Sequence, residues 1–387
     1  MSAVSTAADT AAAHRPLRIV HTESSLGWGG QEIRILTESQ GLIRRGHEVV
    51  VLAAQGARLV EEAPRFRVPV AALPIGRKRP AGVAALMREF RARRVDVVNT
   101  HSSGDSWLSA IACALLGRDA PVIVRTRHVS VPVSNDPASR WLYRRATSRT
   151  VTTGEALRDT LVRVNGLDPA RIDSVPTGIE PEVYARWSKA SARAALHLPD
   201  VVPLVGIVAT LRSWKGHRFL VEAMTKLSHA DARLVIVGDG AQREALERQV
   251  EALDLRRRVT FAGQQDDVAP WLAALDVFAL PSYANEGVPQ ALLQAMFARV
   301  PCVTTDAGAI AEIARDADTA IVVAKEDAGA LANGIDRVLD DPQAAAARAE
   351  RAHAFVSARY ALEPMLDRME DVFRRALRSR GVKTSAA

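Results

Sequence analysis

Runs of apolar residues alternate with amphipathic stretches along the first half of the chain. Apolar runs that predict strands occur at 16–22, 47–54, 95–102 and 120–128. Stretches with helical periodicity lie between them, at 31–46 and 106–117. Strands that are apolar on both faces and separated by helices are typical of a parallel sheet covered on both sides. Since crossovers between parallel strands are right-handed, we expect a doubly wound α/β domain over residues 16–185.

The alternation stops near residue 180 and begins again near residue 200. We interpret the interval as a hinge region. Beyond it, apolar runs predict strands at 203–210, 232–240, 258–263, 276–282 and 300–306. A second doubly wound domain is therefore expected over residues 200–362. We expect the amphipathic helix predicted at 363–381 to dock on the first domain.

Composition agrees with two globular domains. A chain of 387 residues is longer than a domain with one ordinary hydrophobic core. Of these residues, 48% are hydrophobic and 25% are charged, as in globular proteins. No window approaches the roughly 20 apolar residues that span a bilayer. Residues 1–15 lack the pattern of a secretory signal, and we expect a disordered tail there. Cys113 and Cys302 fit no disulfide framework or metal spacing, so we expect inert thiols and a cytoplasmic location.

The excess of positive charge is concentrated in the first half of the chain. Residues 1–200 contain 28 Lys and Arg against 19 Asp and Glu, whereas residues 201–387 contain 23 and 25. Any single basic cluster can be explained as the solvent-exposed face of a helix or loop. The alternative is a surface for a phosphorylated acceptor or an anionic lipid headgroup, with peripheral contact at the inner face of the cytoplasmic membrane. Nucleic acid is not an expected partner, because few aromatic residues accompany the scattered arginines.

In parallel α/β sheets, ligands bind at the carboxyl ends of the strands, where loops lead into helix N-termini. The glycine-rich stretch "SLGWGGQE" follows the first predicted strand. Gly27, Gly29 and Gly30 allow a close backbone approach and positive φ angles. The spacing matches neither GxGxxG nor GxxxxGK[ST], so a structural turn and a phosphate loop both stay open.

Two cations precede a predicted helix in the second half. In "VATLRSWKGHRFLVEA", Arg212 and Lys215 come before a helix that opens near Gly216. Cations at a helix N-terminus oppose the helix dipole, unless an anion lies between them and the helix. This local conflict favours an anionic ligand such as a phosphate.

Two histidines follow predicted strands of the first half. His128 ends the strand in "RTRHVS", and His101 is similarly placed in "NTHSS". A lone histidine is usually a structural residue. Its position at the carboxyl edge of a strand, beside Arg125 and Arg127, makes His128 the stronger candidate for ligand contact and His101 the second.

The stretch "YANEGVPQALLQAMF" (283–297) places polar groups at the start of an apolar helix. Pro289 suits the first turn of that helix. If the helix extends back to Glu286, that residue and Gln294 are about 2.2 turns apart and lie on about the same side. A carboxylate and an amide suit a polyol ligand. A charge that favours the helix dipole and a polar helix edge are the structural alternatives.

These motifs, in this order, resemble the family 4 glycosyltransferases of the GT-B fold. The resemblance covers about residues 16–365 and includes "GGQE", "PTGIE", "RSWKG", "IVGDG", "EGVPQALLQAM" and "TTDAGAIAEI". It implies two Rossmann-like domains that face each other across a cleft. It also implies retaining transfer of a sugar from a UDP- or GDP-linked donor to a glycan or glycolipid, without a metal or cofactor. Lipopolysaccharide or other cell-envelope polysaccharide synthesis is the expected setting.

The resemblance also implies roles for individual residues. Arg212 and Lys215 would neutralise the departing diphosphate, His128 would contact the donor sugar, and Glu286 would hold its hydroxyl groups. The wider donor-binding set is Gly29, Gly30, Thr210, Gly287, Val288, Pro289 and Gln294.

Two positions depart from the family pattern. Gln294 replaces the second glutamate of the usual E-x7-E pair, which holds the ribose hydroxyls. Thr210 stands where an arginine is usual, so we expect Arg212 to take over that role. The competing hypotheses are a nucleotide-sugar 2-epimerase on the same fold and a non-catalytic protein that binds a sugar nucleotide or a lipid.

Overall fold

The structure is a computed structural model that describes residues 15–128, 133–284 and 286–384, with side chains up to residue 379. All of the expected tail except Arg15 lies outside the described residues. The chain divides into two compact units, here called unit 1 (residues 1–176 and 363–387) and unit 2 (residues 177–362). Each unit is described by itself.

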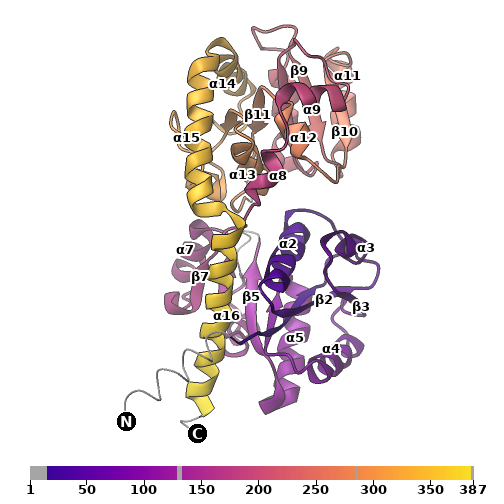
Figure 1. Ribbon diagram of the computed structural model, residues 1–387, viewed down its shortest axis with the longest axis vertical. Helices are drawn as coiled ribbons and strands as arrows, with labels where there is room; N and C mark the ends of the chain where they lie inside the picture. Colours follow the sequence, from indigo (N-terminus) through magenta and orange to yellow (C-terminus); the bar gives the residue numbers. More distant parts are fainter. Residues whose placement is uncertain (1–14, 129–132, 285, 385–387) are drawn as a thin grey trace. The chain divides into compact units, whose positions relative to one another are not determined.

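Unit 1 contains a sheet of seven strands in the order β3-β2-β1-β4-β5-β6-β7 (Figure 1). All neighbouring strands are parallel. The strands are β1 Arg18–Glu23, β2 Glu48–Ala54, β3 Val70–Leu73, β4 Val97–Thr100, β5 Val122–Arg127, β6 Arg149–Thr152 and β7 Ile172–Ser174. The order reverses between β1 and β4, which creates the switch point where ligands bind in doubly wound sheets.

The helices of unit 1 include one from the far end of the sequence. They are α2 Gly30–Arg44, α3 Arg58–Glu62, α4 Pro80–Ala92, α5 Ser103–Leu116, α6 Pro137–Trp141, α7 Glu155–Arg163 and α16 Leu362–Thr384. Arg45, just after α2, forms ion pairs with Glu363 and Glu370 of α16. Gly41 of α2 lies against Leu366, whose Cδ1 would be 2.4 Å from an added Cβ. The C-terminal helix therefore packs on α2 of unit 1.

Unit 2 repeats the architecture with six parallel strands in the order β10-β9-β8-β11-β12-β13 (Figure 1). Its strands are β8 Leu204–Val208, β9 Arg233–Val237, β10 Val259–Gly263, β11 Val277–Leu280, β12 Cys302–Thr304 and β13 Ile321–Val322. The switch point lies between β8 and β11. The prediction of two doubly wound α/β domains is thus confirmed.

The helices of unit 2 begin inside the interval that we interpreted as a hinge. They are α8 Pro181–Tyr184, α9 Lys189–Ala195, α10 His217–Ala223, α11 Arg243–Ala252, α12 Ala269–Ala273, α13 Gln290–Phe297, α14 Ala328–Asp340 and α15 Pro342–Tyr360. Arg193 of α9 is buried, and its guanidinium donates to the Asp276 carboxylate at 2.6 Å and to the carbonyl of Ala274. Because of this anchor, residues 177–200 belong to unit 2, and the first unit ends at Pro176 rather than at residue 185.

Among the helices that the structure describes, none has both the length and the apolar character needed to cross a membrane.

Candidate functional site

The candidate donor-binding residues of unit 2 lie on loops at the carboxyl ends of β8 and β11. Thr210, Arg212 and Lys215 follow β8, and Ser213–Lys215 form a short 3-10 turn that Gly216 connects to α10. The segment from Glu286 to Pro289 follows β11 and leads into α13. These two strands are neighbours at the switch point, so the fold brings together segments that are 71 residues apart along the chain.

Lys215 and Glu286 form an ion pair at this edge. The Lys215 ammonium lies 2.7 Å from Glu286 Oε1 and 3.0 Å from Oε2. The lysine side chain is 20% exposed and the glutamate side chain 6% exposed. Nearby, the backbone amide of Tyr283 donates to the carbonyl of Trp214 at 2.9 Å, which joins the two loops. The pair therefore holds a cation and a carboxylate in fixed relation, partly shielded from water.

Arg212 lies on the same loop with a different environment. It is exposed, and its guanidinium lies 5.6 Å from the centre of the Trp214 ring. Stacking on an aromatic face limits the rotamers of arginine while leaving its N–H groups available. The edge therefore carries two cations, one paired with Glu286 and one facing solvent.

Two glycines that we had not singled out allow the loops after β8 and β12 to approach the loop after β11. Gly216 has φ +76°, and a Cβ there would lie 2.0 Å from the carbonyl oxygen of Pro281. Gly308 has φ +56°, and a Cβ there would lie 2.2 Å from the carbonyl oxygen of Glu286. That oxygen accepts a hydrogen bond from the amide of Ala309 at 3.1 Å. Gly308 lies in the motif "TTDAGAIAEI", so the sequence could have indicated it. Its contact with the Glu286 carbonyl, however, is evident only from the fold.

The helix geometry assumed for Glu286 and Gln294 is wrong. α13 begins at Gln290, and Pro289 precedes it as the N-cap in an extended conformation (φ −72°, ψ 122°). Glu286 is therefore not part of the helix, and its position depends on Lys215 and Gly308 instead. Gln294 is half-buried and forms a hydrogen bond with the Tyr184 hydroxyl of α8. Burial raises the pKa of that hydroxyl above its ordinary value.

His217, the first residue of α10, is a buried neutral histidine next to this loop. Burial, and secondarily the charge of Lys215, lowers its pKa to about 3. An unfolded chain takes up a proton at this residue near pH 6.5, whereas the folded protein does not, so the unfolded state binds more protons between these pH values. The contribution of His217 to the free energy of unfolding is therefore present above pH 6.5 and lost as the pH falls.

This linkage gives a prediction for His217→Gln. As the pH falls below 6, the unfolding free energy of the variant should increase relative to that of the wild type by about 1.4 kcal/mol for each pH unit. Urea denaturation of both proteins at pH 7.5, 6 and 5 measures the change. A difference that stays constant over this range would show that His217 is protonated in the folded state.

The glycine-rich loop of unit 1 leads from β1 into α2. Gly29 is the N-cap and Gly30 the first helical residue. The expected positive φ is not found at Gly29, whose φ of −177° is extended backbone. A Cβ at Gly29 would reach only 3.8 Å from the Glu32 carboxylate, an ordinary contact. The protein itself therefore does not require glycine at position 29.

Three buried carboxyl groups surround the start of this loop, and sequence reasoning did not single them out. Burial raises the pKa of Glu32 and of Asp105 to about 7, with the charge of Glu23 as the next cause for each. Burial also raises the pKa of Glu23. The Asp105 carboxylate accepts hydrogen bonds from the Thr22 hydroxyl at 2.7 Å and from the amides of His101 and Ser102 at 2.9 Å. Asp105 therefore fixes the turn that carries His101.

The two candidate histidines of unit 1 lie side by side. His101 follows β4 and His128 follows β5, and His101 Nδ1 lies 2.9 Å from His128 Nε2. His21 of β1 extends the row, with its Nδ1 2.9 Å from His101 Nε2. Sequence reasoning missed His21 because it lies inside a predicted strand. Its contact with His101 depends on the pairing of β1 with β4.

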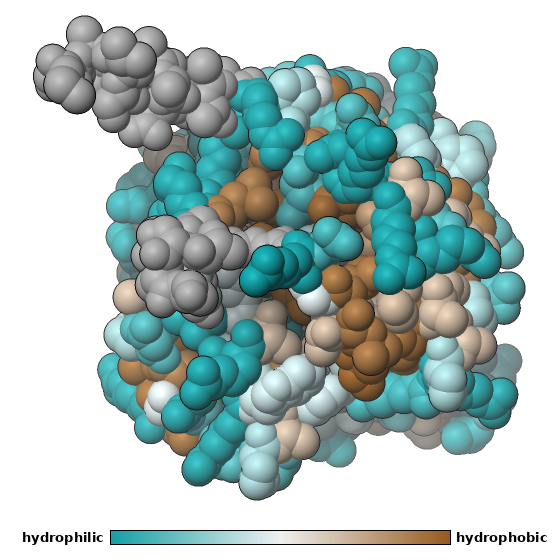
Figure 2. All heavy atoms as spheres, turned by 90° about the horizontal axis from the view of Figure 1, so that it is seen from below, coloured by the Kyte–Doolittle hydropathy of each residue, from teal (hydrophilic) through white to brown (hydrophobic). Residues whose placement is uncertain are grey.

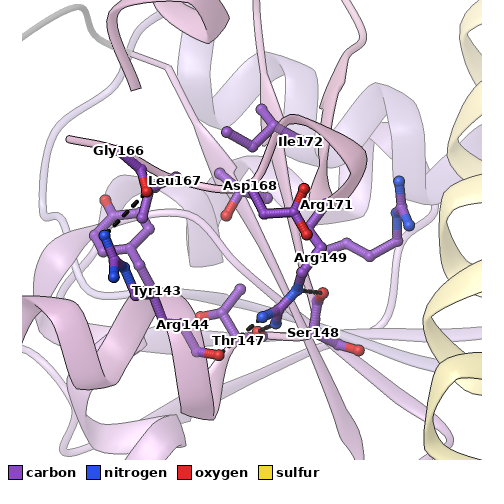
Figure 3. A pocket seen from close by; sticks show the side chains of 11 residues that line it. Tyr143, Arg144, Thr147, Ser148, Arg149, Gly166, Leu167, Asp168, Arg171 and Ile172 are labelled. Atoms are coloured by element: carbon purple, nitrogen blue, oxygen red, sulfur yellow. Dashed lines mark hydrogen bonds between the residues drawn. The ribbon is translucent and has the colours of Figure 1, made fainter. Parts of the chain in front are cut away.

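The pocket in Figure 3 belongs to the opposite edge of the same sheet. Its volume is about 220 Å³, and its residues precede β6 and β7 or lie at their amino ends rather than follow them. The guanidinium of Arg171 donates to the carbonyls of Arg144 and Thr147, and that of Arg144 to the carbonyl of Gly166. These arginines join backbone segments by hydrogen bonds. This structural role accounts for their presence in the pocket without a ligand.

Comparison with known proteins agrees with this arrangement. A model described as "Glycosyltransferase Family 4" matches residues 28–183, and one described as "Glycosyl transferases group 1" matches residues 202–341. A 2-deoxystreptamine glucosyltransferase of Streptomyces kanamyceticus is 27% identical over 84% of this chain and 89% of its own length. A D-inositol 3-phosphate glycosyltransferase of Mycolicibacterium paratuberculosis is 28% identical over 77% of this chain and 71% of its own length.

A solved structure shares the fold. HepE of Anabaena, in complex with UDP-glucose, superposes with a TM-score of 0.80 at 20% identity, over 91% of this chain and 98% of that one. The two family models fall on the two doubly wound units, and the relatives carry glycosyltransferase names. This chain belongs to the family 4 glycosyltransferases of the GT-B fold and is an enzyme of glycosyltransferase type.

Proposed function

We propose that this enzyme transfers a sugar, with retention of configuration, from a nucleotide-diphosphate sugar to a hydroxyl group of a glycan or glycolipid. One observation carries the proposal: the Lys215–Glu286 ion pair lies at the carboxyl ends of β8 and β11, and Arg212 belongs to the same loop as Lys215. A small anionic ligand at this switch point agrees with the general behaviour of doubly wound sheets.

A nucleotide-diphosphate sugar suits the chemistry of this edge. Its diphosphate is anionic and would be neutralised by Arg212 and Lys215, while its sugar hydroxyls would donate to the Glu286 carboxylate. The UDP-glucose in the HepE complex supports a UDP-linked donor, with a GDP-linked donor as the alternative. We assign His128 to the donor sugar, and to donor binding the set Gly29, Gly30, Thr210, Gly287, Val288, Pro289 and Gln294.

The proposed reaction needs positive charge at the leaving group. Cleavage of the bond between the anomeric carbon and the phosphate oxygen builds negative charge on the diphosphate, and preorganised cations stabilise it without reorganising. Since Lys215 and Arg212 supply that charge, we propose that transfer needs no metal ion. The acceptor oxygen would attack the same face that the diphosphate leaves, and the leaving phosphate would take the acceptor's proton. A trapped covalent glycosyl-enzyme would contradict this mechanism.

The leading acceptor is a cell-envelope glycan or glycolipid, as in lipopolysaccharide synthesis, because the first 200 residues carry the basic excess. A small polyol is the second candidate, favoured by the relatives named for 2-deoxystreptamine and D-inositol 3-phosphate. Incubation with both acceptor classes and one active donor, followed by mass spectrometry of the products, separates the two.

Peripheral membrane contact through unit 1 accompanies the first acceptor class. Ile111 and Leu115 of α5 are 41% and 64% exposed, and the Lys78 ammonium lies 5.7 Å from the centre of the Trp107 ring of the same helix. Figure 2 shows hydrophobic side chains exposed among hydrophilic ones. We expect sedimentation with anionic vesicles that falls with salt and with Leu115→Ser. Equal sedimentation with neutral vesicles would count against it.

Gln294→Glu tests the ribose end of the proposed donor site. A carboxylate forms charge-assisted hydrogen bonds with the ribose diol, so we expect the Kd for the nucleotide to fall by about 3- to 10-fold. Isothermal titration with UDP and GDP measures it. Gln290→Glu, which adds the same charge at the first residue of α13, is the matched control. An unchanged Kd in Gln294→Glu would remove Gln294 from the ribose site.

The reaction itself is tested with purified enzyme, an active nucleotide sugar and an accepted glycan. NMR of the product should show the same anomeric configuration as the donor. An inverted product would refute retention. Conversion of the nucleotide sugar to its 2-epimer without an acceptor would indicate an epimerase instead.

A further inference from the structure

A continuous row of three histidines crosses the carboxyl edge of the unit 1 sheet. His21 comes from β1, His101 follows β4 and His128 follows β5, and these three strands are neighbours in the sheet. The two nitrogen–nitrogen distances are both 2.9 Å. Neighbouring ring centres are 5.2 Å apart, with interplanar angles of 21° and 33°. Each contact is short enough to be a hydrogen bond, so each must contain one proton.

The three rings share the protons of neutral imidazoles. Burial lowers the pKa of His21 to about 3 and that of His101 and His128 well below the ordinary value, and the charge of the buried Arg34 lowers all three further. A neutral imidazole carries one N–H, and its other nitrogen accepts. The row therefore has only two arrangements of protons, which run in opposite directions.

The buried end of the row distinguishes these arrangements. His21 is fully buried, and its Nε2 has no hydrogen-bond partner among the described residues. If the protons pointed toward His21, that nitrogen would be a buried N–H without an acceptor, which proteins rarely tolerate. If they point away from it, His21 donates from Nδ1 to His101, and His101 donates from Nδ1 to His128 Nε2. The only proton of His128 is then on Nδ1.

We propose that His21 and His101 are positioning residues that hold His128 in the Nδ1–H form, so that His128 presents an N–H donor to a substrate oxygen at the carboxyl edge of the unit 1 sheet. The ligand part of this statement rests on the proposed function. His128 is half-buried at the carboxyl edge of the sheet, whereas His21 ends the row inside the protein. Because that inner end has no onward partner, the row orients a donor rather than conducts a proton, and His128 is not a general base.

The turn that carries His101 is fixed independently of the rings. The Asp105 carboxylate accepts the amides of His101 and Ser102 and the hydroxyl of Thr22 in β1. The backbone of β4 is thereby attached to β1 at the point where their histidines meet. This attachment keeps His101 between its two neighbours.

The test uses the full-length protein with ¹⁵N-labelled histidine at pH 7.5, without ligand. Long-range proton–nitrogen correlation spectra distinguish a protonated from a bare ring nitrogen. We expect His128 to carry its proton on Nδ1 in the wild type. In His21→Leu, which removes the donor at the buried end, we expect His128 to become a mixture of both forms. His21→Asn keeps an amide N–H in place of Nδ1–H and should restore the wild-type pattern, with buried His217 of unit 2 as the unchanged reference.

Activity provides the second measurement. With a nucleotide sugar that the wild type uses, kcat of His21→Leu should fall about tenfold with little change in KM, and His21→Asn should recover most of it. A wild-type His128 protonated on Nε2, or a pattern unaffected by His21→Leu, would overturn the proposal. If the spectra agree but kcat of His21→Leu equals that of the wild type, the donor role of His128 is refuted. If UDP- and GDP-sugars are not turned over at all, the proposed function fails, while the spectra still decide the tautomer.

Discussion

Lys215→Ala is expected to lower kcat/KM for sugar transfer by about 10³-fold. The lysine ammonium would stabilise charge that develops on the departing diphosphate, and loss of one such preorganised group typically costs two to three orders of magnitude. The change also leaves the Glu286 carboxylate, only 6% exposed, without the cation that lies 2.7 Å away. Steady-state kinetics with the active donor and acceptor measures the effect.

The matched control for this prediction is Lys226→Ala. Lys226 also belongs to unit 2 and also pairs with a glutamate, Glu222, at 3.5 Å, but both side chains are nearly half exposed. Exposed pairs contribute little to stability, so we expect kcat/KM within twofold of the wild type. Equal activity of Lys215→Ala and Lys226→Ala would remove Lys215 from the site. Glu286→Gln should also strongly lower kcat/KM for transfer. The amide lacks the negative charge that pairs with Lys215 and that would accept hydrogen bonds from the sugar hydroxyls.

Gly308→Ala is expected to destabilise unit 2 by about 2–4 kcal/mol and to lower transfer activity as well. The new Cβ would lie 2.2 Å from the Glu286 carbonyl oxygen, a separation at which the backbone must move. Movement of this loop displaces Glu286 relative to Lys215. Urea denaturation and steady-state kinetics of the same preparation measure the two effects.

Gly263→Ala separates the steric effect from the cost of a left-handed backbone. Gly263 also has a positive φ, +69°, but nothing lies within 4 Å of its added Cβ. We expect this control to cost only about 1 kcal/mol, the usual penalty for alanine in that conformation. Similar losses of stability in the two variants would mean that the Gly308–Glu286 contact does not hold the loop.

The long buried strands could be predicted from the sequence, and the short edge strands could not. β2 and β9 are continuous apolar runs, and their predicted bounds differ from the observed ones by at most three residues. β7 and β13 contain three and two residues, too few for a pattern to emerge. Residues 177–200 resembled a hinge because α8 and α9 are short, and because the anchor of Arg193 on Asp276 joins positions 83 residues apart.

The candidate site was predictable in composition but not in geometry. The motifs named Arg212, Lys215 and Glu286, and the fold brings the loops that carry them to one edge of unit 2. The sequence does contain a signal that Glu286 precedes the helix, because Gly287 has a low helix propensity and Pro289 disfavours helical geometry at Val288; the helical spacing assumed for Glu286 and Gln294 neglected it. The row of histidines depends on strand pairing, and periodicity along one segment carries no information about a neighbour 80 residues away.

The most direct test of a nucleotide-sugar site at the Lys215–Glu286 pair is the thermal shift of the wild type and Lys215→Ala with UDP-, GDP- and ADP-sugars. We predict that one class of nucleotide sugar raises the melting temperature of the wild type in a saturable manner, and that Lys215→Ala loses most of this shift while Lys226→Ala keeps it. Stabilisation of Lys215→Ala equal to that of the wild type, or of neither protein by any of these donors, would contradict a nucleotide-sugar site at the Lys215–Glu286 pair.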